Sequence, residues 1–339
     1  MKILILAPFD AGELDQLRRV AEVVHESWIE HRQMLAPVDL AARLVDGGFD
    51  VVAVEAEFVT REVMETVPGL RVVASARGKP VNIDIEAATE LGRVVLQTPG
   101  RNADSVADLC LGMILDRVRH ICAASELVRQ GGWVYSLDDQ TLMPYLRFRG
   151  RELGSLTLGL LGLGAVGRAV ARRARAFGMR VNATDPYQRD DVFQAEGVSR
   201  VDLDGLLGES DIVSIHVELT PETTGLLDAG RLRSMRRGAI LVNTARAKVV
   251  DQEAMVELLR SGHLGAVALD VFHPEPIPVD HPLLNEPGAL LLPHIGGATD
   301  DTVRHHSRMI REDLERLMRG ERPVHCANPL VLDAVGPMG

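Results

Sequence analysis

Three polar residues in the C-terminal half of the chain have side chains suited to proton transfer or to anion binding, and each follows an apolar run. Arg246 comes after AILVNTA, Glu275 after AVALDVFHP, and His294 after ALLLP. A histidine that is hydrogen-bonded to a carboxylate exchanges protons near neutral pH, and an arginine binds a carboxylate through two parallel hydrogen bonds. Each residue alone is more often a solvated charge or a turn residue. Together they predict a site that moves a proton on a small anionic substrate.

A second candidate site is the pattern Gly162-x-Gly164-x-x-Gly167. By itself the pattern is weak evidence, because glycines commonly turn a strand into a helix. Its context is more specific, since strand-like residues 157–161 precede it and a helical pattern of apolar residues follows. Gly162 allows a sharp turn, Gly164 leaves room for a pyrophosphate, and Gly167 lets the helix lie close to the strand. The pattern predicts a dinucleotide site, with an ordinary strand–turn–helix unit as the alternative.

An acidic residue completes the dinucleotide pattern. Gly178 ends the helix, residues 179–184 read as the next strand, and Asp185 follows that strand. At this position a carboxylate accepts hydrogen bonds from the ribose hydroxyls of adenosine and repels a 2′-phosphate. The predicted cofactor is therefore NAD rather than NADP.

These residues require a scaffold of parallel strands to position them. Strand-like runs alternate with amphipathic segments along most of the chain, which is typical of doubly wound α/β domains. In the first hundred residues we expect strands at 2–7, 51–56, 71–76 and 94–98, and helices at 13–24, 37–47 and 84–92. In the second half we expect strands at 157–161, 181–184, 212–219, 239–245, 266–272 and 289–295. The predicted fold class is α/β with two doubly wound parallel sheets.

Two further helices are expected outside these sheets. The segment between Asn102 and Gly131 predicts one long helix whose apolar residues cover most of its circumference, which favours burial on several sides and a subunit contact. Residues 298–320 predict a helix that returns to the first domain. The predicted domains are residues 1–99 with 298–327, residues 100–297, and a tail at 328–339 whose last residues, AVGPMG, are expected to be disordered.

The composition argues against several classes of function. The 339 residues suffice for two domains, and 46% hydrophobic with 25% charged residues is ordinary for a globular protein. A net charge of −11 argues against nucleic-acid and anionic-membrane partners, and no apolar run suits a membrane span or a signal peptide. Cys110, Cys122 and Cys326 are too widely spaced to suggest disulfides or a metal site. We expect a cytoplasmic protein that needs no metal.

The chain resembles the D-isomer-specific 2-hydroxyacid dehydrogenase family, which contains phosphoglycerate dehydrogenase, glyoxylate/hydroxypyruvate reductase and formate dehydrogenase. GLLGLGAVG with Asp185, LVNTARAKVVD, ALDVFHPEP and LLPHIGGAT carry the resemblance, in family order. It implies a Rossmann NAD-binding domain inserted in a flavodoxin-like substrate domain. It also implies that Arg246 binds the substrate, that His294 is the acid/base, and that Glu275 orients this histidine.

The resemblance also implies which residues contact the cofactor and the substrate. Asp270 would contact the nicotinamide amide, and a first-domain loop, SARGKPVNID, would offer backbone N–H groups to the substrate carboxylate. The implied cofactor-binding residues are Gly162, Gly164, Ala165, Val166, Gly167, Asp185, His216, Thr244 and Asp270, and the implied substrate-binding residues are Arg77, Gly78, Lys79 and Arg246.

The chain departs from the family at three places. Ala247 follows the catalytic arginine where glycine is usual, and Glu218 stands at a common proline position on the cofactor side. The substrate loop, usually glycine-rich, carries Arg77 and Lys79, which would face the same side of an extended segment. A cation there suggests a substrate with a second negative group.

The predicted activity is hydride transfer between NAD and a small anionic 2-hydroxyacid or 2-oxoacid, by a homodimer formed through the region around residues 101–150. Two alternatives remain open. The enzyme acts on a different substrate, such as a hydrated aldehyde, phosphite or a phosphonate-bearing acid, or the chain is a non-enzymatic, NADH-sensing corepressor-like protein. Turnover of the cofactor with 2-oxoacids distinguishes the last alternative from an enzyme.

Overall fold

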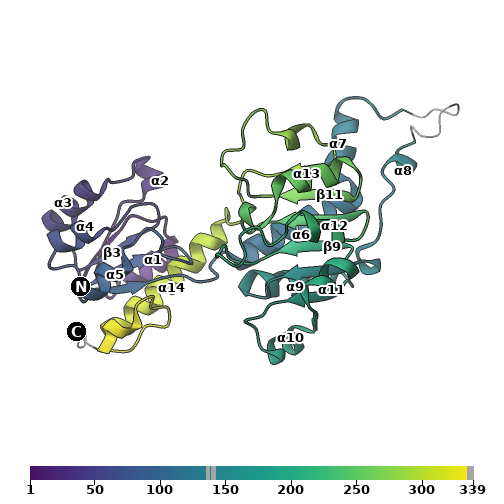
Figure 1. Cartoon of the computed structure of the whole chain (residues 1–339). Coiled ribbons are helices and arrows are strands. Elements are labelled where there is room, and N and C mark those ends of the chain that lie inside the picture. The colour runs from purple at the N-terminus through teal and green to yellow at the C-terminus, as the bar shows by residue number, and fades with distance from the viewer. Residues whose placement is uncertain (135–137, 139–142, 334–339) are drawn as a thin grey trace. The chain divides into compact units, whose positions relative to one another are not determined.

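The computed structural model describes residues 1–134, 138 and 143–333. The chain forms two compact units, shown in Figure 1. One unit contains Met1–Asn102 together with the chain from Thr299 onward, and the other is Ala103–Ala298. The disorder expected for residues 334–339 concerns residues outside the described part of the chain.

The first unit is built on a five-stranded parallel sheet with the strand order β2-β1-β3-β4-β5, which is flavodoxin-like. Apolar side chains from helices cover both of its faces, α1 and α14 on one and α3, α4 and α5 on the other. The strands are β1 (Lys2–Ile5), β2 (Glu22–His25), β3 (Val51–Val54), β4 (Val72–Ser75) and β5 (Val94–Leu96). The helices are α1 (Ala11–Arg18), α2 (Trp28–His31), α3 (Pro37–Gly47), α4 (Arg61–Thr66), α5 (Ile85–Glu90) and α14 (Asp300–Met318).

The helix predicted over residues 13–24 is wrong in its second half. Helix α1 ends at Arg18, and Glu22–His25 form the edge strand β2, paired with β1. Val20, Val23 and Val24 fit a helical spacing as well as a strand, so periodicity alone did not separate the two. Residues 22–25 form a strand because their backbone pairs with that of β1.

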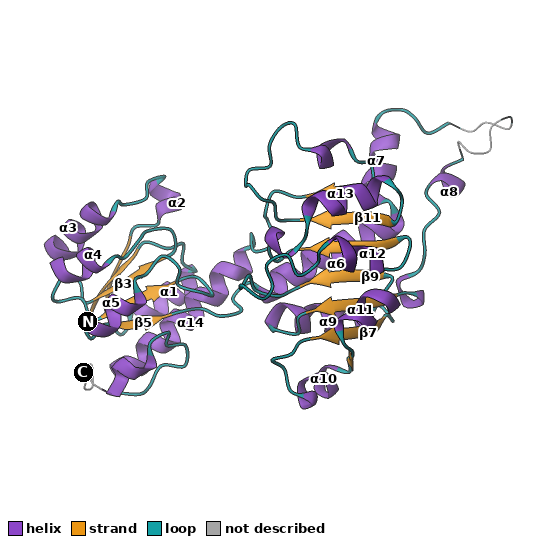
Figure 2. Cartoon of the chain, in the orientation of Figure 1, coloured by secondary structure: helices purple, strands orange, loops and turns teal. Residues whose placement is uncertain are grey.

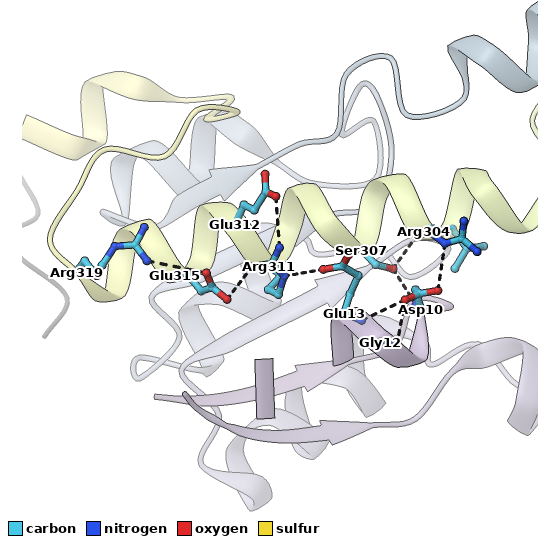
Figure 3. Close-up of polar contacts among 10 residues, drawn as sticks. Asp10, Gly12, Glu13, Arg304, Ser307, Arg311, Glu312, Glu315 and Arg319 are labelled. Carbon is cyan, nitrogen blue, oxygen red and sulfur yellow. Dashed lines mark hydrogen bonds and ion pairs between the residues drawn. The ribbon is translucent and has the colours of Figure 1, made fainter. Parts of the chain in front are cut away.

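Polar contacts with α1 tie α14 to the first unit, as Figure 3 shows. Arg311 of α14 donates to Glu13 over 2.6 Å and to Glu315 over 2.8 Å, and the side chains of Arg311 and Glu13 are each only 12% exposed. The N–H of Asp10, which caps α1, donates to Ser307 Oγ over 2.9 Å. Because a buried charge is costly without its partner, these contacts fix where the helix lies.

The chain after α14 also packs in the first unit. Asn328 accepts a hydrogen bond from the N–H of Val95 over 2.8 Å and donates to the carbonyl of Arg93. The short 3₁₀-helix η5 (Pro329–Asp333) buries Val331. Residues 328–333, which the sequence assigned to a tail, are therefore packed on the edge of this sheet.

The second unit is built on a seven-stranded parallel sheet with the order β12-β11-β10-β9-β6-β7-β8, a Rossmann order. Figure 2 shows its strands in orange among the surrounding helices; α6 and α9 bury one face, and α11, α12 and α13 bury the other. The strands are β6 (Thr157–Leu161), β7 (Arg180–Thr184), β8 (Ser199–Arg200), β9 (Ile212–Ile215), β10 (Ala239–Asn243), β11 (Leu264–Leu269) and β12 (Ala289–Leu291). The helices are α6 (Ala103–Arg119), α7 (Ile121–Arg129), α8 (Pro144–Arg147), α9 (Ala165–Ala176), α10 (Asp190–Glu196), α11 (Leu203–Glu209), α12 (Ala229–Ser234) and α13 (Gln252–Arg260).

The two parallel sheets confirm the predicted fold class. In the second unit the chain runs outward from β6 to β7 and β8, and then returns to place β9 on the other side of β6. The order therefore reverses between β6 and β9. Ligands of such sheets bind at the carboxyl ends of the strands near this point, which is where the candidate residues of the second unit lie.

The single long helix predicted between Asn102 and Gly131 is wrong. Helix α6 ends at Arg119, His120 has a left-handed φ of +56°, and α7 begins at Ile121. The Asp116 carboxylate accepts the N–H of Cys122 over 2.6 Å and so stabilises the break. A side chain that competes for a backbone N–H is a tertiary detail that apolar periodicity does not record.

Candidate active site and cofactor site

The loop between β6 and α9 needs glycine at two positions for steric reasons. Gly162 has φ +101°, and a β-carbon there would lie 2.8 Å from the carbonyl oxygen of His216. A β-carbon on Gly167 would lie 2.3 Å from the carbonyl oxygen of Gly162, so glycine allows α9 to approach the loop. At Gly164 no heavy atom lies within 4 Å of the β-carbon position. This glycine borders open space, which fits a ligand that approaches the backbone.

The start of α9 and a nearby hydroxyl fit a dinucleotide. No side chain caps α9 at Gly164, so the N–H groups of its first turn, around Ala165 and Val166, are available to an anion at the positive end of the helix dipole. The hydroxyl of Thr244, at the end of β10, is buried and has no hydrogen-bond partner within the described residues. A buried hydroxyl normally has a partner, and a bound cofactor would supply one.

Asp185 is held against the glycine loop. One carboxylate oxygen accepts the N–H of Leu163 over 2.8 Å, and the other accepts the N–H of Tyr187 over 2.9 Å. Asp185 thereby links the end of β7 to the loop that follows β6. In dinucleotide-binding units an acidic residue in this position contacts the adenosine ribose, so the placement of Asp185 fits the predicted cofactor site.

His216, whose carbonyl oxygen lies next to Gly162 of the glycine loop, has an uncharged side chain. Burial lowers the pKa of His216 to about 4, so its ring is neutral at neutral pH. Its Nε2 lies 2.9 Å from Ser214 Oγ, which in turn lies 3.3 Å from the buried thiol of Cys110. Burial raises the pKa of Cys110 to about 11, so this thiol is also neutral. The three groups form a hydrogen-bonded chain without a net charge.

His294 and Glu275 are in direct contact. Nδ1 of His294 lies 2.9 Å from Oε2 of Glu275, and the other oxygen of Glu275 accepts the N–H of Phe272 over 2.8 Å. Burial alone would raise the pKa of Glu275, but the Phe272 N–H, the His294 ring and the positive charge of Arg246 outweigh it and lower the pKa. Glu275 is therefore ionised at neutral pH. The side chain of His294 is 52% exposed, which leaves its ring accessible to a substrate.

Asp270 positions the backbone around His294. His294 has φ +56°, a left-handed conformation that is unfavourable for a residue with a β-carbon. The buried carboxylate of Asp270 accepts the N–H groups of the next two residues, Ile295 over 2.8 Å and Gly296 over 2.7 Å. A β-carbon on Gly296 would lie 2.9 Å from Asp270 Oδ2, so glycine is needed for this approach. The sequence suggested a cofactor contact for Asp270 but did not reveal this supporting role.

Asn243 is a positioning residue that sequence reasoning missed. Its side-chain oxygen accepts the N–H of Ala245 over 3.0 Å, and its amide donates to the carbonyl of Arg246 over 2.9 Å. These bonds hold the turn that follows β10 and leave the Arg246 side chain exposed. The available signal was a polar residue, 1% exposed, at the end of an apolar strand.

Arg77, Gly78 and Lys79 lie in the first unit, after β4. The backbone bends at residues 76–79, so the expectation of an extended segment is wrong. Nε of Arg77 donates to the carbonyl of Glu55 over 2.5 Å, which ties the loop after β4 to the loop after β3. Arg77 therefore supports the loop, and Lys79 is exposed.

The described part of the chain contains neither a grouped set of metal ligands nor a helix suited to span a membrane. Within residues 1–134, 138 and 143–333, no three His, Cys, Asp or Glu side chains are grouped so that they could hold a metal ion. No helix in this part of the chain is long and apolar enough to cross a membrane.

A doubly wound sheet with a glycine loop at its switch point is the architecture of dinucleotide-binding enzymes. The sequence model of the D-isomer specific 2-hydroxyacid dehydrogenase NAD-binding domain matches residues 111–296. A glyoxylate reductase from Korarchaeum cryptofilum is 39% identical over 279 residues, 82% of either chain. A D-3-phosphoglycerate dehydrogenase from Methanocaldococcus jannaschii is 34% identical over 330 residues, 97% of this chain and 59% of that relative.

Solved structures with a similar fold cover nearly the whole chain. A crystal structure of a protein from Thermus thermophilus superimposes with a TM-score of 0.79 at 37% identity, covering 96% of this chain and 100% of the other. The apo-structure of D-lactate dehydrogenase from Escherichia coli gives a TM-score of 0.75 at 27% identity, with coverage of 96% and 100%. The chain belongs to the D-isomer specific 2-hydroxyacid dehydrogenase family. It is an NAD-dependent oxidoreductase that acts on a hydroxyacid.

Proposed function

We propose that the protein transfers a hydride between NAD and a small anionic 2-hydroxyacid or 2-oxoacid, with Arg246, Glu275 and His294 as the catalytic residues. The observation that carries this proposal is the 2.9 Å contact between His294 and Glu275 at the carboxyl ends of adjacent strands. It occupies Nδ1 of His294, and Nε2 has no hydrogen-bond partner within the described residues. A ring nitrogen free to exchange a proton is what an acid/base residue requires.

The role of each residue follows from its contacts. In the oxidative direction, Nε2 of His294 accepts the proton of the substrate hydroxyl, and the ionised Glu275 stabilises the imidazolium that forms. In the reductive direction the imidazolium returns this proton to the substrate oxygen. Arg246 binds the substrate carboxylate and polarises the reacting oxygen in both directions. The glycine loop would hold the nicotinamide cofactor, which would supply the hydride acceptor as NAD⁺ and the hydride donor as NADH.

Glu275→Gln is expected to retain partial activity and to move the pH dependence of kcat/KM to lower pH. The pKa of Glu275 is lowered, so its carboxylate is charged throughout the working range and favours the protonated ring of His294. The neutral amide removes this negative charge beside the ring, so the pH limb of kcat/KM that depends on the pair shifts in the acidic direction. The measurement is a pH profile of both variants, with Glu253→Gln as the control. An unchanged profile would disprove the assignment of the pair.

Asp185→Asn is expected to shift the ratio of kcat/KM for NADH over NADPH by at least ~10-fold toward NADPH, because it removes the charge that repels a 2′-phosphate. Asparagine keeps a side-chain carbonyl that can still accept one N–H of the loop. The substitution therefore removes the negative charge and preserves the structure of the loop. Asp191→Asn, an exposed substitution in α10, is the control. A wild-type enzyme that already prefers NADPH would contradict the prediction of NAD.

The substrate is proposed to carry a second negative group that pairs with Lys79. Oxidation of NADH should be observed with 2-oxoacids, and kcat/KM should be higher for acids with a distal carboxylate, phosphate or phosphonate. A charged hydrogen bond is worth about 1.5–3 kcal/mol, so Lys79→Ala should lower kcat/KM for such an acid by roughly 10- to 100-fold and leave a singly charged 2-oxoacid nearly unaffected. An equal loss of kcat/KM with both acids would show that Lys79 does not bind the second negative group. Binding of NADH without turnover of any acid would favour a sensing role.

We also propose that the protein is a homodimer formed through the region around residues 101–150. Helix α7 supports this proposal, because none of its residues is buried and Ile121 and Val128 are 51% and 54% exposed. An apolar helix face of this kind is usually covered by a partner. Part of the region, residues 135–137 and 139–142, lies outside the described chain. The cytoplasmic location expected from the sequence stays a prediction.

A further inference from the structure

A cavity of about 580 Å³ lies in the second unit, beside the amino-terminal ends of the strands. The candidate active site lies at the carboxyl-terminal ends of these strands. Its walls include residues at the amino-terminal ends of strands, such as Ile212 of β9, Ala239 of β10 and Gly265 of β11. Arg246, Glu275 and His294 instead follow the carboxyl ends of their strands. The cavity is therefore separate from the catalytic residues, and its volume is that of a metabolite site. Arg117 and Arg149 lie within the region proposed for the subunit contact, so a ligand site here requires that a dimer formed through α7 leave this cavity open.

Arginine supplies most of the charged side chains that line this cavity. Asp211 is the one acidic residue that lines it within the described chain, and both of its carboxylate oxygens are already engaged. Oδ1 pairs with Arg151 over 3.2 Å and with Arg236 over 3.1 Å, while Oδ2 accepts the N–H of Thr157 over 2.9 Å. The arginines that line the cavity are Arg117, Arg149, Arg151, Arg236 and Arg237.

The positive charge of the cavity exceeds what the surrounding carboxylates neutralise. Arg117 pairs with Asp116 over 2.8 Å, and the other oxygen of Asp116 accepts the N–H of Cys122. Neither Arg149 nor Arg237 has a side-chain partner in the part of the chain that the structure describes. Several guanidinium groups thus converge in a chain whose net charge is −11. Their mutual repulsion is unfavourable without a counter-ion.

We propose that this cavity binds a small organic polyanion through its phosphate or carboxylate groups, with Arg149 and Arg237 as the main contacts. The guanidinium group suits this role because its planar N–H donors match the oxygens of phosphate and carboxylate. The cavity and the catalytic residues lie at opposite ends of the strands. The ligand of the cavity is therefore neither the substrate nor the cofactor of the proposed reaction. The site is a second, effector-type site on the cofactor-binding unit.

The test is a calorimetric titration of the full-length protein with pyrophosphate and, separately, with citrate, in the presence of saturating NADH so that the glycine loop is occupied. Wild type should bind one anion per chain, and Arg149→Gln/Arg237→Gln should weaken this binding at least ~10-fold, as expected for the loss of charged hydrogen bonds. Arg172→Gln/Arg233→Gln, which removes two charges elsewhere on the same unit, should bind as wild type does. The kcat with a 2-oxoacid should be unchanged in both double variants.

Thermal unfolding without added anion gives a second measure. Because Arg149 and Arg237 have no partner to lose within the described residues, Arg149→Gln/Arg237→Gln should have a Tm equal to or above that of wild type. Pyrophosphate should raise the Tm of wild type and of Arg172→Gln/Arg233→Gln, and should raise that of Arg149→Gln/Arg237→Gln much less. Equal anion binding by both double variants, or no saturable binding by wild type, would overturn the proposal. So would a wild-type dimer that binds no anion and becomes a monomer in Arg149→Gln/Arg237→Gln, because the cavity would then hold an acidic segment of a second copy.

Discussion

His294→Asn should lower kcat by at least ~100-fold, because asparagine cannot exchange a proton with the substrate oxygen near neutral pH. The affinity for NADH should change by less than about twofold, since the glycine loop and Asp185 lie on other strands of the sheet and keep their contacts. The measurements are kcat with a 2-oxoacid and a fluorescence titration with NADH. Asparagine can also adopt the left-handed φ of +56° that this position requires, so the backbone is preserved.

His273→Asn is the matched control for this prediction. His273 lies in the loop that carries Glu275, is exposed, and has no side-chain partner within the described residues. Its replacement should leave kcat within about twofold of wild type. If His294→Asn kept kcat within tenfold of wild type, another group would have to move the proton and the proposed acid/base assignment would be wrong.

Arg246→Gln should lower kcat/KM by about 100- to 10,000-fold, because two charged hydrogen bonds to the substrate, each worth about 1.5–3 kcal/mol, are lost. Arg246→Lys should recover only part of the activity, since an ammonium group cannot bind a carboxylate bidentately while polarising the reacting oxygen. The loss should be seen with every 2-oxoacid, in contrast to the selective loss expected for Lys79→Ala.

Lys248→Gln is the control for Arg246→Gln. Lys248 is an exposed cation two residues further along the same loop, so its replacement removes the same charge without the proposed contact. Its kcat/KM should stay close to that of wild type. A variant of Arg246 that weakened only the binding of NADH would place this residue in the cofactor site instead.

Local patterns were strong enough to predict most of the second unit. The apolar runs that begin at Thr157, Ala239, Ala266 and Ala289 coincide with strands of its sheet, and the spacing of glycines identified the loop before α9. The strands predicted at 239–245, 266–272 and 289–295 are too long, because the observed strands end at Asn243, Leu269 and Leu291. These signals are local, since a strand buried on both faces must be apolar and a turn with positive φ favours glycine. The same reasoning failed at β2 and at the break between α6 and α7, where hydrogen bonds outside the apolar pattern decide the structure.

The sequence by itself determined the two parallel sheets, the glycine loop, and the presence of Arg246, Glu275 and His294 after successive strands. Only the tertiary structure decided how these side chains are held. The contact between His294 and Glu275, and the N–H groups of Ile295 and Gly296 that donate to Asp270, depend on adjacent strands ending side by side. The same holds for the arginine-lined cavity, whose members are spread from Arg117 to Arg237. Contacts between residues far apart in sequence arise from strand order and register, and neither composition nor periodicity encodes them.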